Sequence, residues 1–358
     1  MQIIQDLKDG IASGRFKPGQ RLSSEFELVK LFGASRITVN RALRELQLGG
    51  LIERRAGSGS YVRADSSRSH TFGLLIPELG QTEIFEPICQ GMAEAQQVEQ
   101  HSLLWGRSVA DSATKEAEAI EVCQELVAKK VSGVFFAPLE LTPGKDATNR
   151  SIAAVFEEAR IPVVLLDRDL EAYPARSRYD LVGIDNRRAG YAITAHLIKM
   201  GCKRLVFVGR PRSAPTVDAR VAGFREALMD GELDLSPASV WRIETRDGAE
   251  VRKLIDQARP DGVVCANDFT AAHLMRSFNE IGVNVPAEVR MVGIDDVKYA
   301  SLLPVPLTTI HQPCFEMGTT AVLTMAHRLR NPTYPARDVL LDFTLVVRRS
   351  CGSPEPVG

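Results

Sequence analysis

The sequence predicts an α/β protein in which a small helical N-terminal domain precedes a larger region of doubly wound parallel sheets. Three observations predict it. Residues 1–63 follow the order helix, helix, helix, hairpin. From Thr71 onward, short apolar runs alternate with helical stretches, which is the pattern of βαβ units and parallel sheets. This alternation occurs twice, before and after about residue 172, so we expect two similar α/β lobes.

The N-terminal helices are indicated by apolar spacing and by capping residues. Apolar residues recur at helical spacing over Ile3–Ile11, and the sequence GRFKPGQRL then ends that helix. Ser23 or Ser24 can cap a second helix, and Ser35 can cap a third. The runs LIERR and SYVRA flank glycines and predict two short strands. These elements predict a winged helix-turn-helix domain over residues 1–63.

The polar segment RADSSRSH contains three serines and no apolar anchor, so we expect a linker over residues 64–70. The body should then cover residues 71–349, and the tail residues 350–358. Within the body, we expect the chain to cross between the lobes near residues 172, 306 and 336. The first lobe would comprise about residues 71–172 and 306–336, and the second about residues 173–305 and 337–349.

The formal charge of the chain is −1, but the charge is unevenly distributed. Residues 1–65 carry eleven Lys/Arg against seven Asp/Glu, a net charge of +4. The remaining residues carry 33 Lys/Arg against 38 Asp/Glu, a net charge of −5. A basic head on an acidic body indicates that the head contacts a polyanion.

Residue spacing argues against several other classes of protein. The six cysteines are scattered without a C-x-x-C pair, so we expect reduced, buried thiols. The histidines lack metal-ligand spacing, and neither G-x-S-x-G nor G-x-x-x-x-G-K-[ST] occurs. We therefore expect no catalytic residues, no metal and no cofactor. No apolar run approaches the ~20 residues of a membrane span, and no signal-peptide pattern occurs, so we expect a cytoplasmic protein without membrane contact.

The third predicted helix has the composition of a DNA-recognition helix. Arg36, Asn40 and Arg44 recur at i, i+4 and i+8 on one face, beside Ile37 and Arg41. Arginine suits guanine edges or phosphates, asparagine suits adenine, and an isoleucine methyl group suits thymine. A helix-turn-helix followed by a wing places such a helix in the major groove. A solvated basic helix is the alternative that the spacing alone leaves open.

The segment RLSSEFELVKLFGASRITVNRALRELQLGGLIERRAGSGSYV resembles the winged-helix domain of the GntR repressor family, and the resemblance covers nearly all of residues 2–63. Two positions depart from the family pattern. Phe26 replaces the arginine of the family's P-S-E-R segment, and we expect a packed side chain rather than a wedge between bases. Asn40 replaces the second arginine of the recognition helix, so base preference there should differ. The resemblance implies a DNA surface with Arg36, Thr38, Asn40 and Arg41, and a wing shaped by Gly57 and Gly59.

The body resembles the effector domain of the LacI repressor family, itself similar to periplasmic sugar-binding proteins. The resemblance covers about residues 71–349 and includes VGIDNRRAGYAITAHLIKMGCKRLVFVG and PDGVVCANDFTAAHLMRSFNEIGVNVPAEVRMVGIDD. It implies a two-lobed periplasmic-binding-protein-like fold that closes on a ligand. A GntR-type head on a LacI-type body is the combination seen in arabinose-repressor-like proteins.

Polar residues end several of the predicted body strands. Asp167 ends the run VVLL, Asn267 ends VVCA and Asp295 ends MVGI, while Arg220 opens a helix after a strand and a loop. Such residues converge at one edge of an open parallel sheet, where charged groups can grip adjacent hydroxyls of a polyol. The resemblance implies ligand contacts from Phe85, Asp167, Thr216, Arg220, Asn267, Asp295 and Gln312.

Several neighbouring positions have a structural alternative. Asp268 can cap the helix that begins FTAA, and Asp185 and Asn186 can cap the helix RRAGYAITAHLI. Arg168 can pair with Asp169 in solvent. The segment RIETRDG lacks the aromatic residue that many family members place over the sugar ring.

The sequence therefore predicts a ligand-responsive bacterial transcription regulator, which we expect to be a repressor. Its expected partners are double-stranded operator DNA, a small sugar-like effector and a second copy of the chain. We expect the dimer contact on the helices FEPICQGMAEAQ and FTAAHLMRSFNEIG. The alternatives are a sugar- or nucleotide-binding module, or an enzyme, with a vestigial DNA-binding head. The sequence is compatible with a ligand that either releases or promotes DNA binding.

Overall fold

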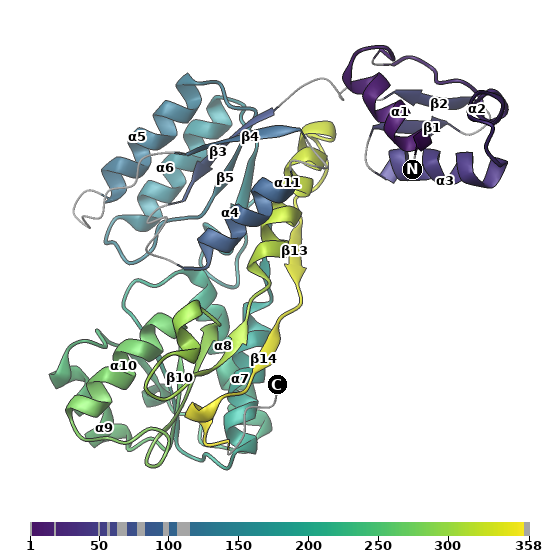
Figure 1. Ribbon diagram of the computed structural model, residues 1–358. Coiled ribbons are helices and arrows are strands. Elements are labelled where there is room, and N and C mark those ends of the chain that lie inside the picture. Colours follow the sequence, from purple (N-terminus) through teal and green to yellow (C-terminus); the bar gives the residue numbers. More distant parts are fainter. Residues whose placement is uncertain are drawn as a thin grey trace. The chain divides into compact units, whose positions relative to one another are not determined.

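A computed structural model describes residues 2–17, 19–48, 51–55, 58–62, 70–76, 83–95, 100–105 and 115–353 (Figure 1). The chain divides into two compact units. The first comprises Met1–Thr71 and Glu94–Leu103, and the second comprises Phe72–Ala93 and Leu104–Gly358. Gly57 of the predicted wing, residue 63 and residues 64–69 of the predicted linker lie outside the described residues.

The head contains three helices and a hairpin, as predicted. These are α1 (Gln2–Ala12), α2 (Glu25–Phe32), α3 (Arg36–Leu48), β1 (Ile52–Arg55) and β2 (Gly59–Val62). Ser24 rather than Ser23 caps α2, because its hydroxyl accepts from the Glu27 amide while the Glu27 carboxylate accepts from the Ser24 amide. One apolar cluster joins all five elements through Leu7, Leu28, Val39, Leu43, Leu46, Ile52 and Val62.

The first lobe of the body is built on a six-stranded sheet with the order β13-β7-β6-β5-β3-β4. The pairs from β13 to β3 are parallel. Helices cover both faces, with α5 and α6 on one face and α4 and α11 on the other (Figure 1). This doubly wound arrangement buries the strands on both sides, which explains their continuous apolar runs. The strands are β3 (His70–Leu75), β4 (His101–Trp105), β5 (Gly133–Phe136), β6 (Val163–Leu166), β7 (Asp180–Ile184) and β13 (Asp338–Leu341), and the helices are α4 (Phe85–Glu94), α5 (Lys115–Ala128), α6 (Lys145–Glu158) and α11 (Cys314–Arg330).

The second lobe repeats this plan with the sheet order β14-β12-β11-β10-β8-β9. Its pairs are parallel except for the antiparallel pair of β12 with β14. Helices α9 and α10 pack with β8, β10 and β11 around one apolar core. The strands are β8 (Leu205–Gly209), β9 (Val240–Arg242), β10 (Gly262–Cys265), β11 (Arg290–Asp295), β12 (Thr308–His311) and β14 (Thr344–Val346). The helices are α7 (Asn186–Lys199), α8 (Pro215–Asp230), α9 (Gly248–Ala258) and α10 (Asp268–Glu280), with 3-10 turns η2 (Pro237–Ser239), η3 (Lys298–Ser301) and η4 (Arg349–Cys351).

The strand pairing changes the positions of the three expected crossings between the lobes. β7 pairs with β6, so the first sheet continues to Ile184 rather than ending near residue 172. β12 pairs with β11, which moves the second crossing from about residue 306 to beyond His311. β13 pairs with β7, so the third crossing follows Leu341 rather than residue 336. A buried strand has the same apolar composition in either lobe, and only its hydrogen-bond partner decides where it belongs.

Both ends of the predicted body also need correction. His70 was expected in the linker but begins β3. Ser350 was expected in the tail but is fully buried in the second lobe, where its hydroxyl donates to the Met291 carbonyl and accepts from the Thr308 amide. The second lobe therefore includes the first residues of the expected tail.

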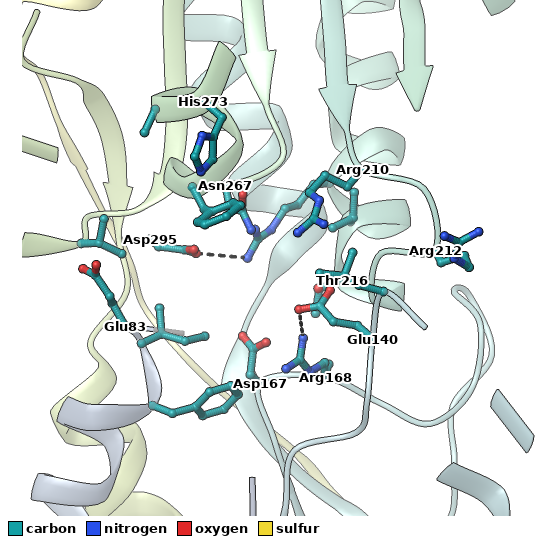
Figure 2. A pocket seen from close by; sticks show the side chains of 18 of the residues that line it. Glu83, Glu140, Asp167, Arg168, Arg210, Arg212, Thr216, Asn267, His273 and Asp295 are labelled. Carbon is teal, nitrogen blue, oxygen red and sulfur yellow. Dashed lines mark hydrogen bonds and ion pairs between the residues drawn. The ribbon is translucent and has the colours of Figure 1, made fainter. Parts of the chain in front are cut away.

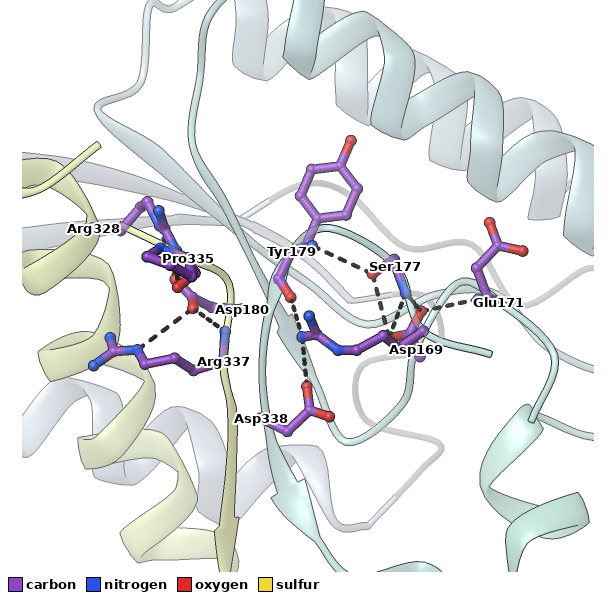
Figure 3. Close-up of polar contacts among 10 residues, drawn as sticks. Asp169, Glu171, Ser177, Tyr179, Asp180, Arg328, Pro335, Arg337 and Asp338 are labelled. Atoms are coloured by element: carbon purple, nitrogen blue, oxygen red, sulfur yellow. Dashed lines mark hydrogen bonds and ion pairs between the residues drawn. The ribbon is translucent and has the colours of Figure 1, made fainter. Parts of the chain in front are cut away.

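Polar contacts fix the segment that leads into β7 and the start of β13 (Figure 3). The buried Asp180 carboxylate accepts hydrogen bonds from Arg328 Nε and from the Arg337 amide, both at 2.9 Å. Arg176 donates to Asp338 at 2.6 Å. These contacts hold β13 at the edge of the first sheet, so the last crossing starts from a fixed position.

Within the parts of the chain that the structure describes, no helix is long and apolar enough to cross a bilayer.

Candidate functional site

The outer face of α3 displays the polar residues that were predicted to contact DNA. Ser35 caps the helix, because its hydroxyl accepts from the Thr38 amide at 3.2 Å. The inward stripe is buried, whereas Arg36, Asn40 and Arg41 are exposed and Ile37 is 82% exposed. A large apolar side chain with that exposure is available to a partner surface.

A polar network connects this face to the hairpin. Arg54 of β1 donates from Nη1 to Asn40 Oδ1 at 2.9 Å and from Nη2 to Glu25 Oε1 at 2.5 Å. Glu25 also lies 3.6 Å from Arg36 Nε. The Asn40 carbonyl oxygen therefore already has a donor, so its NH2 group remains for a base. Sequence reasoning did not assign Arg54 this role, and placed it only in the predicted strand LIERR.

Two further head residues were assigned from the sequence. Gly59 has a φ of 119°, a backbone conformation that favours glycine, and it begins the second wing strand. Phe26 is 67% exposed, with the Lys30 ammonium 4.6 Å from its ring centroid, so the expectation of a packed side chain was wrong. Phe26 lies at the second position of α2, whose inward contacts are made by Leu28 instead.

A cavity of about 720 Å³ lies in the body and is lined by residues of both lobes (Figure 2). Apolar side chains such as Phe85 and Phe269 share its wall with charged and polar groups, as in sites that orient a small ligand. Six of the seven residues predicted to bind ligand line this cavity, namely Phe85, Asp167, Thr216, Arg220, Asn267 and Asp295.

The strand ends bring these residues together as expected for open parallel sheets. Asp167 directly follows β6, Asn267 lies two residues after β10, and Asp295 is the last residue of β11. Arg220 projects from α8, and Phe85 is the first residue of α4. The carboxyl ends of strands from both sheets thus face one cavity.

Arg220 is the most firmly held of these side chains, with 4% of it exposed. Its Nε donates to Asn186 Oδ1 at 2.8 Å and its Nη1 donates to the Ala266 carbonyl at 2.6 Å. Asp295 Oδ1 lies 3.7 Å from Nη2. Burial raises the pKa of Asp295 to about 8, against the opposing effect of the Arg220 charge. The guanidinium is therefore oriented in advance, because its other donors are already bonded.

Asp167 carries a buried oxygen that the protein leaves unbonded. Its backbone has a φ of 66°, and Oδ1 has no hydrogen-bond partner among the described residues. Burial raises the pKa of this carboxyl. An unbonded buried acceptor costs free energy, and a strained non-glycine residue is typical of ligand sites, so this oxygen is suited to accept from a ligand hydroxyl.

Gln312 does not line the cavity. It donates from Nε2 to Asp295 Oδ1 at 2.7 Å, and its own Oε1 is buried without a partner among the described residues. Gln312 therefore acts on the cavity through Asp295 in this arrangement.

The structure shows which of the candidate capping residues at α7 and α10 form caps. Asn267, not Asp268, caps α10, because its Oδ1 accepts from the amide and hydroxyl of Thr270. Asp268 is fully buried and accepts from Thr309 Oγ1 at 2.6 Å. Asp185 caps α7 as expected, whereas Asn186 holds Arg220.

Arg168 was expected to pair with Asp169 in solvent, and this was wrong. Arg168 is buried, forms an ion pair with Glu140, and lies over the Phe85 ring with its Cζ 5.5 Å from the centroid. Glu140 Oε2 also accepts from the Ala214 amide at 3.0 Å, which connects the first lobe to the second. Glu140 follows β5, so the strand-end signal could have found it.

The cavity also contains an aromatic wall that the sequence did not reveal. The segment RIETRDG lacks an aromatic residue, but Phe269 of α10 lines the cavity with 36% of its surface exposed. Arg210 and His273 line it too, and Arg210 follows β8. The strand-end pattern in VFVGR was the available signal for Arg210.

All six cysteines are buried and unpaired, in agreement with the expectation of reduced thiols. Burial raises the pKa of Cys123 to about 11 and that of Cys89 to about 12. Among the described residues, no group of three or more His, Cys, Asp or Glu side chains is placed to hold a metal ion.

Comparison with known proteins gives matches for both parts of the chain. Residues 1–62 match the family of bacterial regulatory proteins called the gntR family, and residues 194–351 match the periplasmic binding protein-like domain. The chain is 27% identical to an arabinose metabolism transcriptional repressor of Geobacillus stearothermophilus, over 98% of this chain and 96% of the repressor. It is 26% identical to a ribose operon repressor of Bacillus subtilis (strain 168), over 79% of this chain and 81% of that protein.

Solved structures share the fold. The transcriptional regulator CelR in complex with cellobiose aligns with a TM-score of 0.66 and 25% identity, over 88% of this chain and 90% of that chain. The transcription regulator CcpA of Lactococcus lactis aligns with a TM-score of 0.67 and 20% identity, over 79% of this chain and 99% of that chain. The chain is therefore similar to the gntR family over residues 1–62 and to the periplasmic binding protein-like domain over residues 194–351.

Proposed function

We propose that this chain is a ligand-responsive bacterial transcription regulator that acts as a repressor. The head binds operator DNA through α3 and the wing, and the body binds a small sugar-like effector in the cavity between its lobes. The observation that carries the proposal is the presence, in one chain, of an exposed recognition face and a polar cavity at the strand ends. The relatives with which it shares most of its length are named as repressors of sugar metabolism rather than as enzymes.

The proposed DNA surface consists of Arg36, Ile37, Thr38, Asn40 and Arg41 on α3, with Gly57 and Gly59 in the wing. The exposure of the α3 residues supports the proposal, because none of these side chains is needed by the core of the head. Basic side chains supply affinity for phosphates, and side chains that reach base edges supply sequence preference.

The proposed ligand site consists of Phe85, Asp167, Thr216, Arg220, Asn267 and Asp295, with Gln312 acting through Asp295. Asp167 and Asp295 can accept hydrogen bonds from hydroxyl groups, whereas Arg220 and Asn267 can donate to them. Phe85 is a buried apolar surface in the first-lobe wall. A ligand that contacts residues of both lobes binds the closed arrangement better and shifts the population toward it.

We further propose a homodimer in the bacterial cytoplasm that binds a pseudo-palindromic operator. A single head of this size offers few base contacts, and two heads bind two half-sites about one helical turn apart. Sedimentation of the full chain at micromolar concentration, with and without operator, tests this. A monomer under both conditions would contradict it.

Selection of duplexes from a random DNA library by the full-length chain tests the regulator itself. We expect one enriched motif, retained by Arg178→Ala and lost or altered by Arg36→Ala. Arg178 is an exposed arginine of the body, so the control removes the same charge far from α3 in the sequence. If the wild-type chain enriches no motif, the proposed DNA-directed function is refuted. The remaining alternatives are then a ligand-binding module and an enzyme, and turnover assays on sugars would distinguish them.

A further inference from the structure

Arg210 and His273 line the second-lobe side of the cavity, apart from Asp167 and Glu83 (Figure 2). We call Arg210, Arg246, Phe269 and His273 the arginine–phenylalanine cluster. The Cζ atoms of both arginines lie 5.6 Å from the centroid of the Phe269 ring. Arg246 also contacts both ring nitrogens of His273, at 2.8 and 3.3 Å. The aromatic ring thus holds two guanidinium groups beside the cavity.

Arginine charges surround His273 in this cluster. Burial, together with the charges of Arg246, Arg210 and Arg276, lowers the pKa of His273, so its ring is neutral and can accept from Arg246. Arg276 has its own partner, since it forms an ion pair with Glu280 at 2.9 Å. Arg210 and Arg246 are the charges that remain to be balanced.

One carboxylate partly balances them. Glu244 Oε2 lies 3.5 Å from Arg210 Nε, and about half of the Glu244 side chain is exposed. Within the described part of the chain, neither Arg210 nor Arg246 has another ion pair. Around the Phe269 ring, two guanidinium groups are thus accompanied by one partly exposed carboxylate, which leaves positive charge locally unbalanced.

Four arginines line the cavity, of which Arg212 is exposed, and Arg210 differs from Arg168 and Arg220 in its hydrogen bonding. Arg220 is bonded to Asn186 and Ala266, and Arg168 is paired with Glu140. The Arg210 guanidinium donates no hydrogen bond to any described residue, although it lines the cavity and is 29% exposed. A guanidinium fork with open donors and low exposure is suited to a carboxylate or phosphate, which it can bind through two parallel hydrogen bonds.

We propose that the effector is an acidic sugar derivative whose carboxylate or phosphate is bound by Arg210 beside Phe269, while its hydroxyl groups contact Asp167, Arg220 and Asp295. This inference rests on the proposed function, because it names the ligand class of the same cavity. In Figure 2, Glu83 and Asp167 lie toward one side of the cavity and Arg210 toward the other, while Arg168 lies beside Asp167 and Glu140 lies between them and Arg210. A ligand with an acidic end can place that end at Arg210, whereas a neutral sugar brings no negative charge to this guanidinium.

Calorimetric titration of the full-length chain with matched probes tests the proposal. Each set contains a neutral sugar, the same sugar with a terminal carboxylate, and the same sugar with a terminal phosphate, on the glucose, galactose and arabinose skeletons. In at least one set we expect an acidic probe to bind about tenfold to a hundredfold tighter than its neutral counterpart, the range of a charge-assisted hydrogen-bonded pair. The comparison between the carboxylate and the phosphate tells which anion the site takes.

Arg210→Gln should abolish that preference while leaving the weaker affinity for the neutral sugar unchanged. Arg225→Gln is the matched control, because Arg225 is an exposed arginine of α8 that does not line the cavity, and this variant should keep the preference. Arg210→Lys should keep part of it, since the charge remains but the fork is lost.

The proposal is overturned if neutral sugars bind as tightly as their acidic counterparts, if no acidic probe binds, or if Arg210→Gln weakens both kinds of probe equally. A neutral sugar that binds and changes operator affinity would overturn this inference while supporting the regulator. An acidic probe that binds through Arg210 without changing operator affinity would support the inference and contradict the regulator.

Discussion

A methyl group added at Gly223 should force α7 and α8 apart and disturb the cavity. A Cβ atom at this position would lie 1.9 Å from the Arg187 carbonyl oxygen and 2.6 Å from the Tyr191 amide nitrogen, where real Cβ atoms essentially never approach within 3.0 Å. Both neighbours are backbone atoms of α7, so the clash cannot be relieved by the movement of a flexible side chain. The helices must therefore separate by more than about 1 Å, the difference between 3.0 and 1.9 Å.

The expected cost of Gly223→Ala combines two opposing effects. Overpacking of a core typically costs ~1–3 kcal/mol, and the rigid backbone contacts place this site in the upper part of that range. Replacing a helical glycine with alanine stabilises the helix by up to ~1 kcal/mol. We therefore expect the free energy of unfolding of the second lobe to fall by about 2 kcal/mol.

The same displacement should weaken ligand binding. Arg220 lies three residues before Gly223 on α8, and its Nε donates at 2.8 Å to Asn186 of α7. A separation of more than 1 Å would take this contact beyond hydrogen-bonding distance. We therefore expect ligand affinity to fall about tenfold, the effect of one lost or misplaced hydrogen bond to a charged group.

Urea unfolding followed by the fluorescence of Trp241 measures the stability effect. The chain has two tryptophans, and Trp105→Phe leaves Trp241, which packs against the core of the second lobe. The control is Gly248→Ala, because Gly248 begins α9 and an added Cβ there meets nothing within 4 Å. That variant should be at least as stable as the parent. Equal unfolding midpoints and equal ligand affinities for Gly223→Ala and the parent would refute the close-packing argument.

Three further variants test other parts of the structure. Arg36→Ala should lower operator affinity by ~1–3 kcal/mol and relax preference at one base pair, as fluorescence anisotropy with single-base operator variants would show. Arg54→Ala should free the Asn40 carbonyl oxygen and broaden the base preference opposite Asn40 in a duplex selection, whereas an unchanged motif would contradict the role of Arg54 as a positioning residue. Asp180→Ala should lower the unfolding free energy of the body by ~3–5 kcal/mol, because it leaves the Arg328 guanidinium without its buried carboxylate, and urea unfolding would detect this.

The parts of the fold that local sequence determines were predictable. The start of α3 follows from Ser35, whose hydroxyl can satisfy a free amide at the beginning of a helix. The convergence of Asp167, Asn267 and Asp295 follows from the common direction of parallel strands. In each case the relevant interaction spans few residues or depends on a general property of parallel sheets.

Long-range pairings were not predictable in the same way. The assignment of β7 to the first sheet depends on its ladder with β6, and the buried pairing of Arg168 depends on Glu140, 28 residues earlier in the chain. The exposure of Phe26 depends on which face of α2 packs inward, and Leu28 takes that place. Residue type alone does not choose among partners that are equally compatible with burial or charge.

The central claim is that one chain couples ligand binding in the body to DNA binding by the head. Ligand affinity should be measured by calorimetry on the full-length chain, alone and saturated with the selected operator duplex, using the probe that binds tightest. Coupling between sites is reciprocal, so a ligand that releases the operator must itself bind more weakly to the operator complex. For a repressor we expect a decrease of about five- to tenfold, the lower part of the usual range of coupling free energies. Equal ligand affinity with and without operator would contradict the account, whatever the folds of the two parts.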